Sequence, residues 1–227
     1  MRWQDKGFLL SLNKYNENSA IAEFFTENNG KISGVIFGAT SKKIKNYLLI
    51  GNKFHLNYNI KQDSKLGYFK LEIDEVKTPQ YLDNKKKLFC IIYTMNIVKI
   101  LTVENQENKN IYKLLSNFFV LLSDNDTWLT SFIFWELNFY KCIGYDIEFK
   151  NYVKNKKIDG DDKFVVESTK KIISNFLINN DIYANNKTDI FNGFKIVGEF
   201  LDKSILKPNN ISFPSSRIEF GKLIKQI

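Results

Sequence analysis

The spacing of apolar residues changes once along the chain, close to Pro79. Before Pro79, apolar and polar residues alternate one by one in short runs, as in Phe54-His55-Leu56. Because successive side chains of a strand point to opposite faces, this alternation predicts strands with one buried face. After Pro79, long apolar segments at 88–103, 111–122 and 127–143 are typical of helices. We therefore expect an α+β chain, with a β domain at 1–79 and a helical domain at 80–227.

The β part contains five alternating runs. Asn28-Asn29-Gly30 separates the second run from the third and predicts a hairpin turn, since Asn and Gly accept positive φ. A short helix capped by Ser41 is expected between the third and fourth runs. This order suits a five-stranded OB-type β-barrel, and an SH3-like barrel stays open as the alternative. The predicted strands are 7–14, 20–26, 31–40, 53–60 and 67–74.

The C-terminal part is expected to be an all-α helical domain. Its third apolar segment carries four large aromatic residues along one face and is apolar on most of the rest, which favours a central core helix over a base-stacking surface. The polar stretch 151–163 predicts an exposed loop, and further helices are expected at 165–178, 189–205 and 215–225. The four aromatic residues are Trp128, Phe132, Trp135 and Phe139.

Few residues are available for metal or nucleophilic chemistry. Cys90, Cys142 and His55 are too few for a four-ligand zinc site, and no phosphate-binding glycine loop occurs. The acidic run 159–162 lacks the distal Glu of a calcium loop, so we interpret it as a solvated turn rather than the divalent-ion site of an enzyme. We therefore expect no catalytic site, no metal and no cofactor. No membrane association is expected either, because the longest apolar stretch, 88–103, is shorter than the ~20 residues of a membrane span.

The charge distribution favours a nucleic-acid partner. The formal net charge is +8, and no acidic residue lies between Glu27 and Asp63. An OB-type barrel binds single-stranded nucleic acid through lysines for phosphate and aromatic rings for bases, and Phe37 and Tyr68 are further candidate rings. A solvated charged surface is the alternative, and the spacing leaves both open. The candidate binding residues are Lys31, Lys42, Lys43, Lys45, Lys53 and Tyr47.

Several short motifs resemble, in order and spacing, those of the bacterial recombination mediator family RecO. The clearest are the opening Trp3-Gln4-Asp5-Lys6-Gly7-Phe8-Leu9-Leu10 and the segment Gly38-Ala39-Thr40-Ser41-Lys42-Lys43. Others lie at 15–21, 25–31, 66–67, 134–137 and 143–145, so the resemblance covers roughly the first two-thirds of the chain.

The resemblance implies an N-terminal OB domain, a helical C-terminal domain and a non-enzymatic role. Proteins of this family bind single- and double-stranded DNA, anneal complementary strands, work with RecR and the tail of the single-stranded DNA-binding protein SSB, and help to load the recombinase RecA. A bacterial cytoplasmic, nucleoid-associated location follows. This chain lacks the four-cysteine zinc site that some members of the family carry, and it has lysines where the family has an arginine cluster. Phosphate contact survives that exchange, because lysine keeps the charge. An RNA-binding or translation-linked OB module stays open as the alternative.

The resemblance also implies a groove for the acidic SSB tail in the helical part. Such a tail, ending in an apolar residue and a carboxylate, needs an apolar notch with lysines at its rim. The candidate residues are Lys99, Tyr112 and Lys113. The alternative is that Tyr112 is a core residue and Lys113 is only solvated.

Overall fold

The computed structural model describes residues 2–61, 64–158, 161–166, 170–184 and 186–225. The chain divides into two compact units. Unit 1 comprises Met1–Leu115 with Pro214–Leu223, and unit 2 comprises Ser116–Phe213 with Ile224–Ile227. The predicted boundary between residues 79 and 80 stays a prediction.

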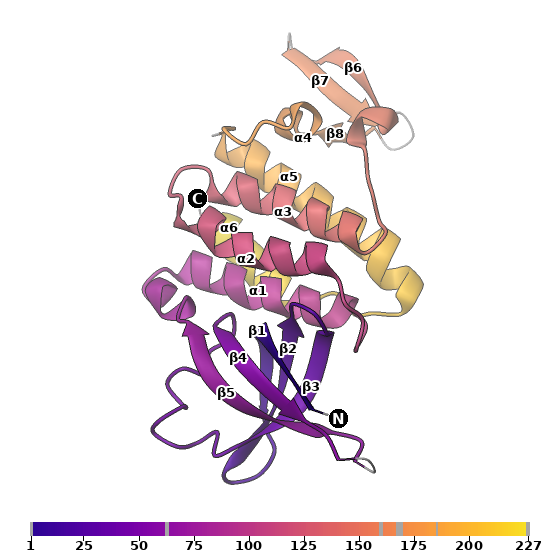
Figure 1. Cartoon of the computed structure of the whole chain (residues 1–227). Helices are drawn as coiled ribbons and strands as arrows, with labels where there is room; N and C mark the ends of the chain where they lie inside the picture. The colour runs from indigo at the N-terminus through magenta and orange to yellow at the C-terminus, as the bar shows by residue number, and fades with distance from the viewer. Residues whose placement is uncertain (1, 62–63, 159–160, 167–169, 185, 226–227) are drawn as a thin grey trace. The chain divides into compact units, whose positions relative to one another are not determined.

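Unit 1 contains a closed five-stranded barrel (Figure 1). The strands are paired in the order β1-β2-β3-β5-β4, and β1 closes the barrel by pairing with both β2 and β4. The pairing of β3 with β5 is parallel, and the other pairings are antiparallel. The OB-type barrel and the α+β class are thus confirmed. The strands are β1 (Arg2–Lys14), β2 (Ser19–Thr26), β3 (Gly30–Phe37), β4 (Lys53–Asn59) and β5 (Gly67–Glu75).

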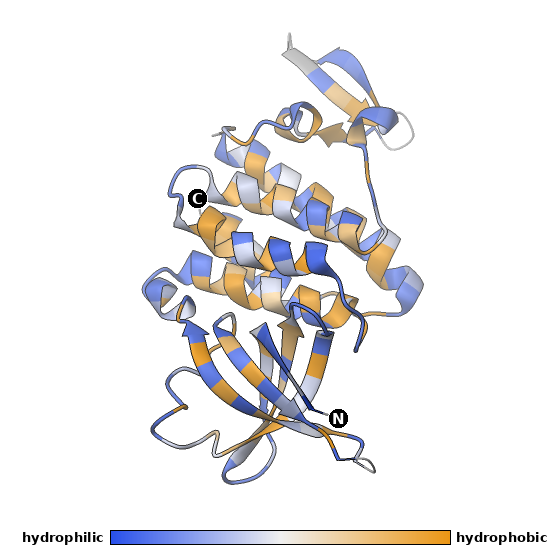
Figure 2. Ribbon diagram, in the orientation of Figure 1, coloured by the Kyte–Doolittle hydropathy of each residue, from blue (hydrophilic) through white to orange (hydrophobic). Residues whose placement is uncertain are grey.

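The apolar residues of the alternating strands point inward and fill the barrel. Figure 2 shows hydrophilic and hydrophobic residues alternating along the strands. Phe24 is at the centre, with its ring edge-on to those of Phe54 and Phe69 at centroid distances of 5.8 and 5.0 Å. Gly34 makes room for this packing, because a Cβ at that position would lie 2.5 Å from the Phe69 ring. Aromatic side chains therefore fill the interior of the barrel, and Gly34 leaves room for them.

The helices of unit 1 are α1 (Lys85–Leu101), the first part of α2 (Lys109–Ser123) and most of α6 (Ser215–Lys225). A short 3₁₀ turn, η1 (Thr78–Tyr81), leads from β5 into α1, which lies across one end of the barrel in Figure 1. The C-terminal helix α6 packs on α1 through Arg217, which is 3% exposed and donates from Nε to the Tyr93 hydroxyl at 3.2 Å. The predicted helices at 88–103 and 215–225 are confirmed.

Unit 2 is built around α3 (Trp128–Cys142). The rings of Phe132, Trp135 and Phe139 are buried and stack in sequence, with interplanar angles of 12° and 13°. The preference for core packing over base stacking is therefore confirmed for this helix. The other helical elements are η2 (Phe149–Tyr152), α4 (Asn175–Asn179), α5 (Lys187–Phe200), the π-helical η3 (Leu201–Leu206) and η4 (Lys207–Asn209).

Three short strands correct the expectation of an all-α C-terminal domain. They form a sheet in the order β6-β7-β8, so the predicted loop at 151–163 is wrong. The predicted helix at 165–178 is also wrong except at its C-terminal end, where α4 begins at Asn175. The β-branched pairs Val165-Val166 and Ile172-Ile173 favour strands, and the pattern of β6 is too polar to signal a strand by alternation. Asp159 and Gly160 of the acidic run lie outside the described residues. The strands are β6 (Val153–Ile158), β7 (Asp161–Val166) and β8 (Ile172–Ile173).

Two expectations about helices remain, one for the segment after Ser41 and one for a membrane span. The short helix expected after Ser41 is a series of turns instead. In the part of the chain that the structure describes, no helix has both the length and the apolarity to cross a membrane.

Asn52 provides a test of how the barrel holds its longest connection. Its side chain accepts hydrogen bonds from the backbone N–H groups of Lys77 and Thr78 at 2.9 and 3.1 Å and donates to the Tyr47 carbonyl at 2.9 Å. Asn52→Ala leaves these groups without that partner, so we expect a loss of about 3 kcal/mol in the free energy of unfolding, measured with urea. The control Asn46→Ala, at an exposed position of the same connection, changes it by less than about 0.5 kcal/mol. Equal urea midpoints for the two variants would contradict the anchoring role.

Candidate nucleic-acid interface

The β3–β4 connection, residues 38–52, presents its basic residues to solvent. Its first turn is closed by a hydrogen bond from the Ser41 N–H to the Gly38 carbonyl at 2.9 Å, and Gly38 has the positive φ of 70° that favours glycine there. Ile44 and Leu48, four residues apart, pack against the barrel core. The residues between and before them therefore face outward: Lys42, Lys43, Lys45 and Tyr47 are all exposed.

The β1–β2 turn holds the start of this connection in place. The Ala39 N–H donates to the Asn18 carbonyl at 3.1 Å, and the Thr40 hydroxyl donates to the Asn18 side-chain oxygen at 2.7 Å. Tyr15 of the same turn is 59% exposed. Lysines and aromatic rings thus lie on two connections that are hydrogen-bonded to each other, and we call Lys42, Lys43, Lys45 and Tyr47 the basic loop.

Lys31 lies away from the basic loop. It is at the start of β3, six residues or about 20 Å of extended strand from Phe37, after which the loop begins. Its ammonium donates to the Lys99 carbonyl at 2.7 Å. Burial lowers the pKa of Lys31, and the like charge of Lys99 adds to this effect, while Glu23 and Glu104 oppose it.

Lys53 is engaged inside unit 1. Its ammonium lies 3.1 Å from a carboxylate oxygen of Glu75 and 3.5 Å from one of Asp74, and over the rings of Phe8 and Tyr112. Burial by itself lowers the pKa of Lys53, but the hydrogen bond to Glu75 and the charges of both carboxylates raise it overall. The structure therefore brings Lys42, Lys43, Lys45 and Tyr47 together and keeps Lys31 and Lys53 in internal contacts. Their DNA contacts stay predictions.

The residues predicted for the SSB tail also differ in environment. Lys99, in the last turn of α1, forms an ion pair with Glu23 at 2.5 Å. The Tyr112 ring is 8% exposed and packs on the Phe8 ring at a centroid distance of 5.6 Å, and burial raises the pKa of Tyr112 to about 12. Lys113 is exposed. Of the two lysines, Lys113 is thus the more accessible to an acidic peptide.

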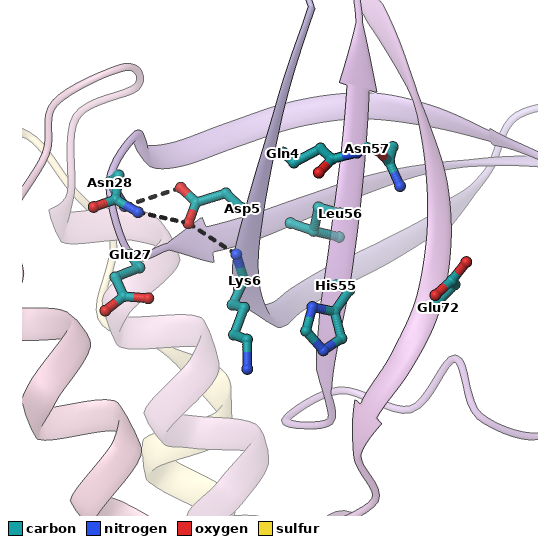
Figure 3. Close-up of a pocket in the computed structure, with 9 residues that line it drawn as sticks. All are labelled: Gln4, Asp5, Lys6, Glu27, Asn28, His55, Leu56, Asn57 and Glu72. Carbon is teal, nitrogen blue, oxygen red and sulfur yellow. Dashed lines mark hydrogen bonds between the residues drawn. The ribbon is translucent and has the colours of Figure 1, made fainter.

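A polar recess of about 510 Å³ opens on the side of the barrel (Figure 3). Three carboxylates line it, which disfavours phosphate, and one of them has a structural role. Asp5 accepts hydrogen bonds from the Asn28 backbone and side chain and from the Asn29 side chain, at 2.7 to 3.0 Å, and so fixes the predicted β2–β3 turn. The lining residues are Gln4, Asp5, Lys6, Glu27, Asn28, His55, Leu56, Asn57 and Glu72.

Metal ligands are sparse in the described ranges. Among those residues, no group of three or more His, Cys, Asp or Glu side chains is placed to hold a metal ion. Cys90 is buried and Cys142 is half-buried.

Further polar residues lie on the outside of the barrel, and the sequence alone did not single them out as binding residues. Arg2 and Lys70 are exposed, and Asn57 and Asn59 are half-buried on the outside of the barrel. The signal was available, because these residues occupy the outward positions of the alternating runs.

The fold and this surface define an OB-barrel protein with a basic, aromatic loop region and an additional helical unit. Two family models match the chain: "Recombination protein O N terminal" covers residues 1–74, and "Recombination protein O C terminal" covers residues 83–182. The chain belongs to the RecO family of DNA repair and recombination proteins.

Several curated relatives match over nearly their whole length. A protein named DNA repair protein RecO from Ehrlichia chaffeensis is 26% identical, with 99% of this chain and 98% of the relative covered. Proteins of the same name from Wolbachia sp. subsp. Drosophila simulans and from Rhodopseudomonas palustris (strain TIE-1) are 23% and 22% identical. They cover 96% and 97% of this chain and are themselves covered over 98% and 94% of their length.

The salt dependence of DNA binding tests the basic loop. Each phosphate neutralised on a single strand contributes about −0.7 to the slope of log K against log salt, so replacing Lys42, Lys43 and Lys45 by Ala flattens the slope by about two. The slope is measured by fluorescence anisotropy with oligo-dT at several salt concentrations. A control triple variant at the exposed residues Lys85, Lys109 and Lys195 keeps the wild-type slope. A flattened slope in the control and not in the loop variant would contradict the assignment of the phosphate contacts to the basic loop.

Proposed function

We propose that this protein is a non-enzymatic recombination mediator. It binds and anneals single-stranded DNA and helps to load the recombinase RecA onto DNA coated by SSB. Its partners are single- and double-stranded DNA, RecR and the C-terminal tail of SSB. Membership of the RecO family supports the repair role.

The observation that carries the DNA-binding part is the basic loop. Its three lysines are exposed, and the chain has no acidic residue between Glu27 and Asp63. The loop is also held by hydrogen bonds at its first turn and at Asn52, so the charges are presented without ordering a long flexible segment on binding. Cationic side chains placed in this way attract the phosphates of a nucleic acid whatever its nucleotide sequence.

Annealing follows physically from such a site. Two complementary strands repel each other through their phosphates, and a protein that neutralises part of that charge lowers the repulsion. Stacking rings hold unpaired bases without reading their identity, so the bases stay available to a complementary strand. None of these steps makes or breaks a covalent bond.

Strand annealing on SSB-coated DNA tests the proposal. Two complementary oligonucleotides carrying a donor and an acceptor dye are coated with SSB and mixed. Wild-type protein accelerates pairing, and the Lys42/Lys43/Lys45→Ala variant does so about tenfold less at 0.1 M salt. The control variant at Lys85, Lys109 and Lys195 stays close to wild type.

Two further assays test the alternative functions, an RNA-binding module and a nuclease. Preferred binding of RNA over single-stranded DNA of equal length, without annealing, would favour an RNA-binding module. Strand cleavage on adding magnesium would contradict the non-enzymatic role.

The proposed SSB-tail site predicts a charge effect at Lys113. The acidic tail meets an exposed ammonium there, and one partly screened contact is worth about 1 kcal/mol, so Lys113→Glu weakens binding of a labelled tail peptide several-fold. Lys99→Gln has a smaller effect, because Lys99 is paired with Glu23. Lys195→Glu is the control. Wild-type affinity in all three variants would place the tail elsewhere.

A further inference from the structure

The outward positions of three neighbouring strands form one continuous surface on the barrel. Strand register pairs Asn59 of β4 with Tyr68 of β5 on one side and with Arg2 of β1 on the other. Two residues further along each strand, Asn57 lies between Lys70 and Gln4. Since every second residue of a strand shares a face, these six side chains lie on the same side of the sheet. We call them, together with Phe37 at the end of β3, the outer barrel face.

Two aromatic rings on this face lie beside each other, one of them exposed (Phe37) and the other half-buried (Tyr68). Phe37 is 60% exposed, and its ring centroid lies 5.8 Å from that of Tyr68 at an interplanar angle of 54°. The inward aromatic pair of the neighbouring strands is different, because Trp3 stacks on Tyr58 at 4.8 Å and Tyr58 belongs to the core. The exposed ring of Phe37 and the accessible part of the Tyr68 ring together offer flat apolar surface to a ligand with flat apolar groups.

The charges around the two rings indicate what that ligand is. Arg2 and Lys70 are exposed on this face, the amides of Gln4, Asn57 and Asn59 lie between them, and none of its residues is acidic. The first carboxylate along β5, Glu72, follows Lys70 by two residues and lines the polar recess together with Gln4 and Asn57. The part of the face away from that recess carries Arg2, Asn59, Tyr68 and Lys70. The basic loop is close, since a single turn closed by the bond between Ser41 and Gly38 separates Phe37 from Lys42. Rings, amides and cations without carboxylates suit phosphates and unpaired bases.

We propose that the outer barrel face is a base-stacking platform on which Phe37 and Tyr68 hold bases of a single strand whose phosphates lie on Arg2, Lys70 and the basic loop. The proposal rests on the DNA-binding function proposed above and deepens it by naming the part of the ligand that is recognised. Bases in a duplex already stack on each other and do not offer their faces. The platform therefore gives a preference for single strands, whereas the lysines bind both forms.

Oligonucleotides with and without bases test this assignment. Full-length wild-type protein and the variants Phe37→Ala and Tyr68→Ala are titrated with a dT oligomer of about twelve nucleotides, with an abasic oligomer of the same length and with a duplex. We expect each variant to lose about tenfold in affinity for the dT oligomer, with the salt slope unchanged. Affinity for the abasic oligomer and the duplex stays within about twofold of wild type. Tyr68→Phe retains the ring and the affinity, and Tyr183→Ala, at a 75% exposed tyrosine of unit 2, is the matched control.

Each other outcome overturns the platform. Equal losses on all three ligands mean that the rings act on backbone contacts or on the fold, and circular dichroism separates these two causes. Wild-type affinity in both ring variants, combined with a flattened salt slope in the Lys42/Lys43/Lys45→Ala variant, leaves DNA binding intact and removes the stacking role. Unchanged DNA binding with reduced self-association, measured by sedimentation, assigns the rings to a protein interface. Failure of wild-type protein to bind any of the three ligands refutes the proposed function itself.

Discussion

Closure of the barrel by β1 is the constraint on which the rest of unit 1 depends. The first half of β1 pairs with β4 and the second half with β2, the two pairings overlap at Gly7 and Phe8, and the register shifts just beyond this overlap, between Leu9 and Ser11. Such an irregularity bends a strand and increases its twist, which lets one strand belong to both sides of a barrel. A closed barrel has no free strand edge, so its surface is made of side-chain faces and connections.

The barrel divides the basic residues into two groups with different physical roles. Lys53 and Lys99 neutralise carboxylates within unit 1, through Glu75 and Glu23. The lysines of the basic loop extend from turns whose apolar residues, Ile44 and Leu48, are held by the core. The same residue type thus stabilises the fold at Lys53 and Lys99 and remains accessible to phosphate in the basic loop. The net charge of +8 does not reveal this division.

Most of the fold follows from local patterns, and the failures have an identifiable cause. Period-two alternation located β1, β4 and β5, and the Asn28-Asn29-Gly30 turn located β2 and β3 on either side of it. The glycine takes the positive φ of 67° that the turn needs. The small sheet from β6 to β8 was missed, because β6 carries three lysines and gives no apolar alternation. Its strand conformation depends on pairing with β7, which a local pattern does not encode.

The sequence by itself determined the succession of strands and helices, the acid-free lysine segment and, through motif order, the family, because these depend on neighbouring residues. The tertiary structure decided which basic residues are accessible. Lys31 and Lys42 look alike in the sequence, yet one donates to a carbonyl of α1 and the other extends into solvent. It also decided that Phe37 and Tyr68 are neighbours, although they are 31 positions apart. Strand register sets both outcomes, because pairing between distant segments fixes where each side chain lies, and no short stretch of the sequence contains that information.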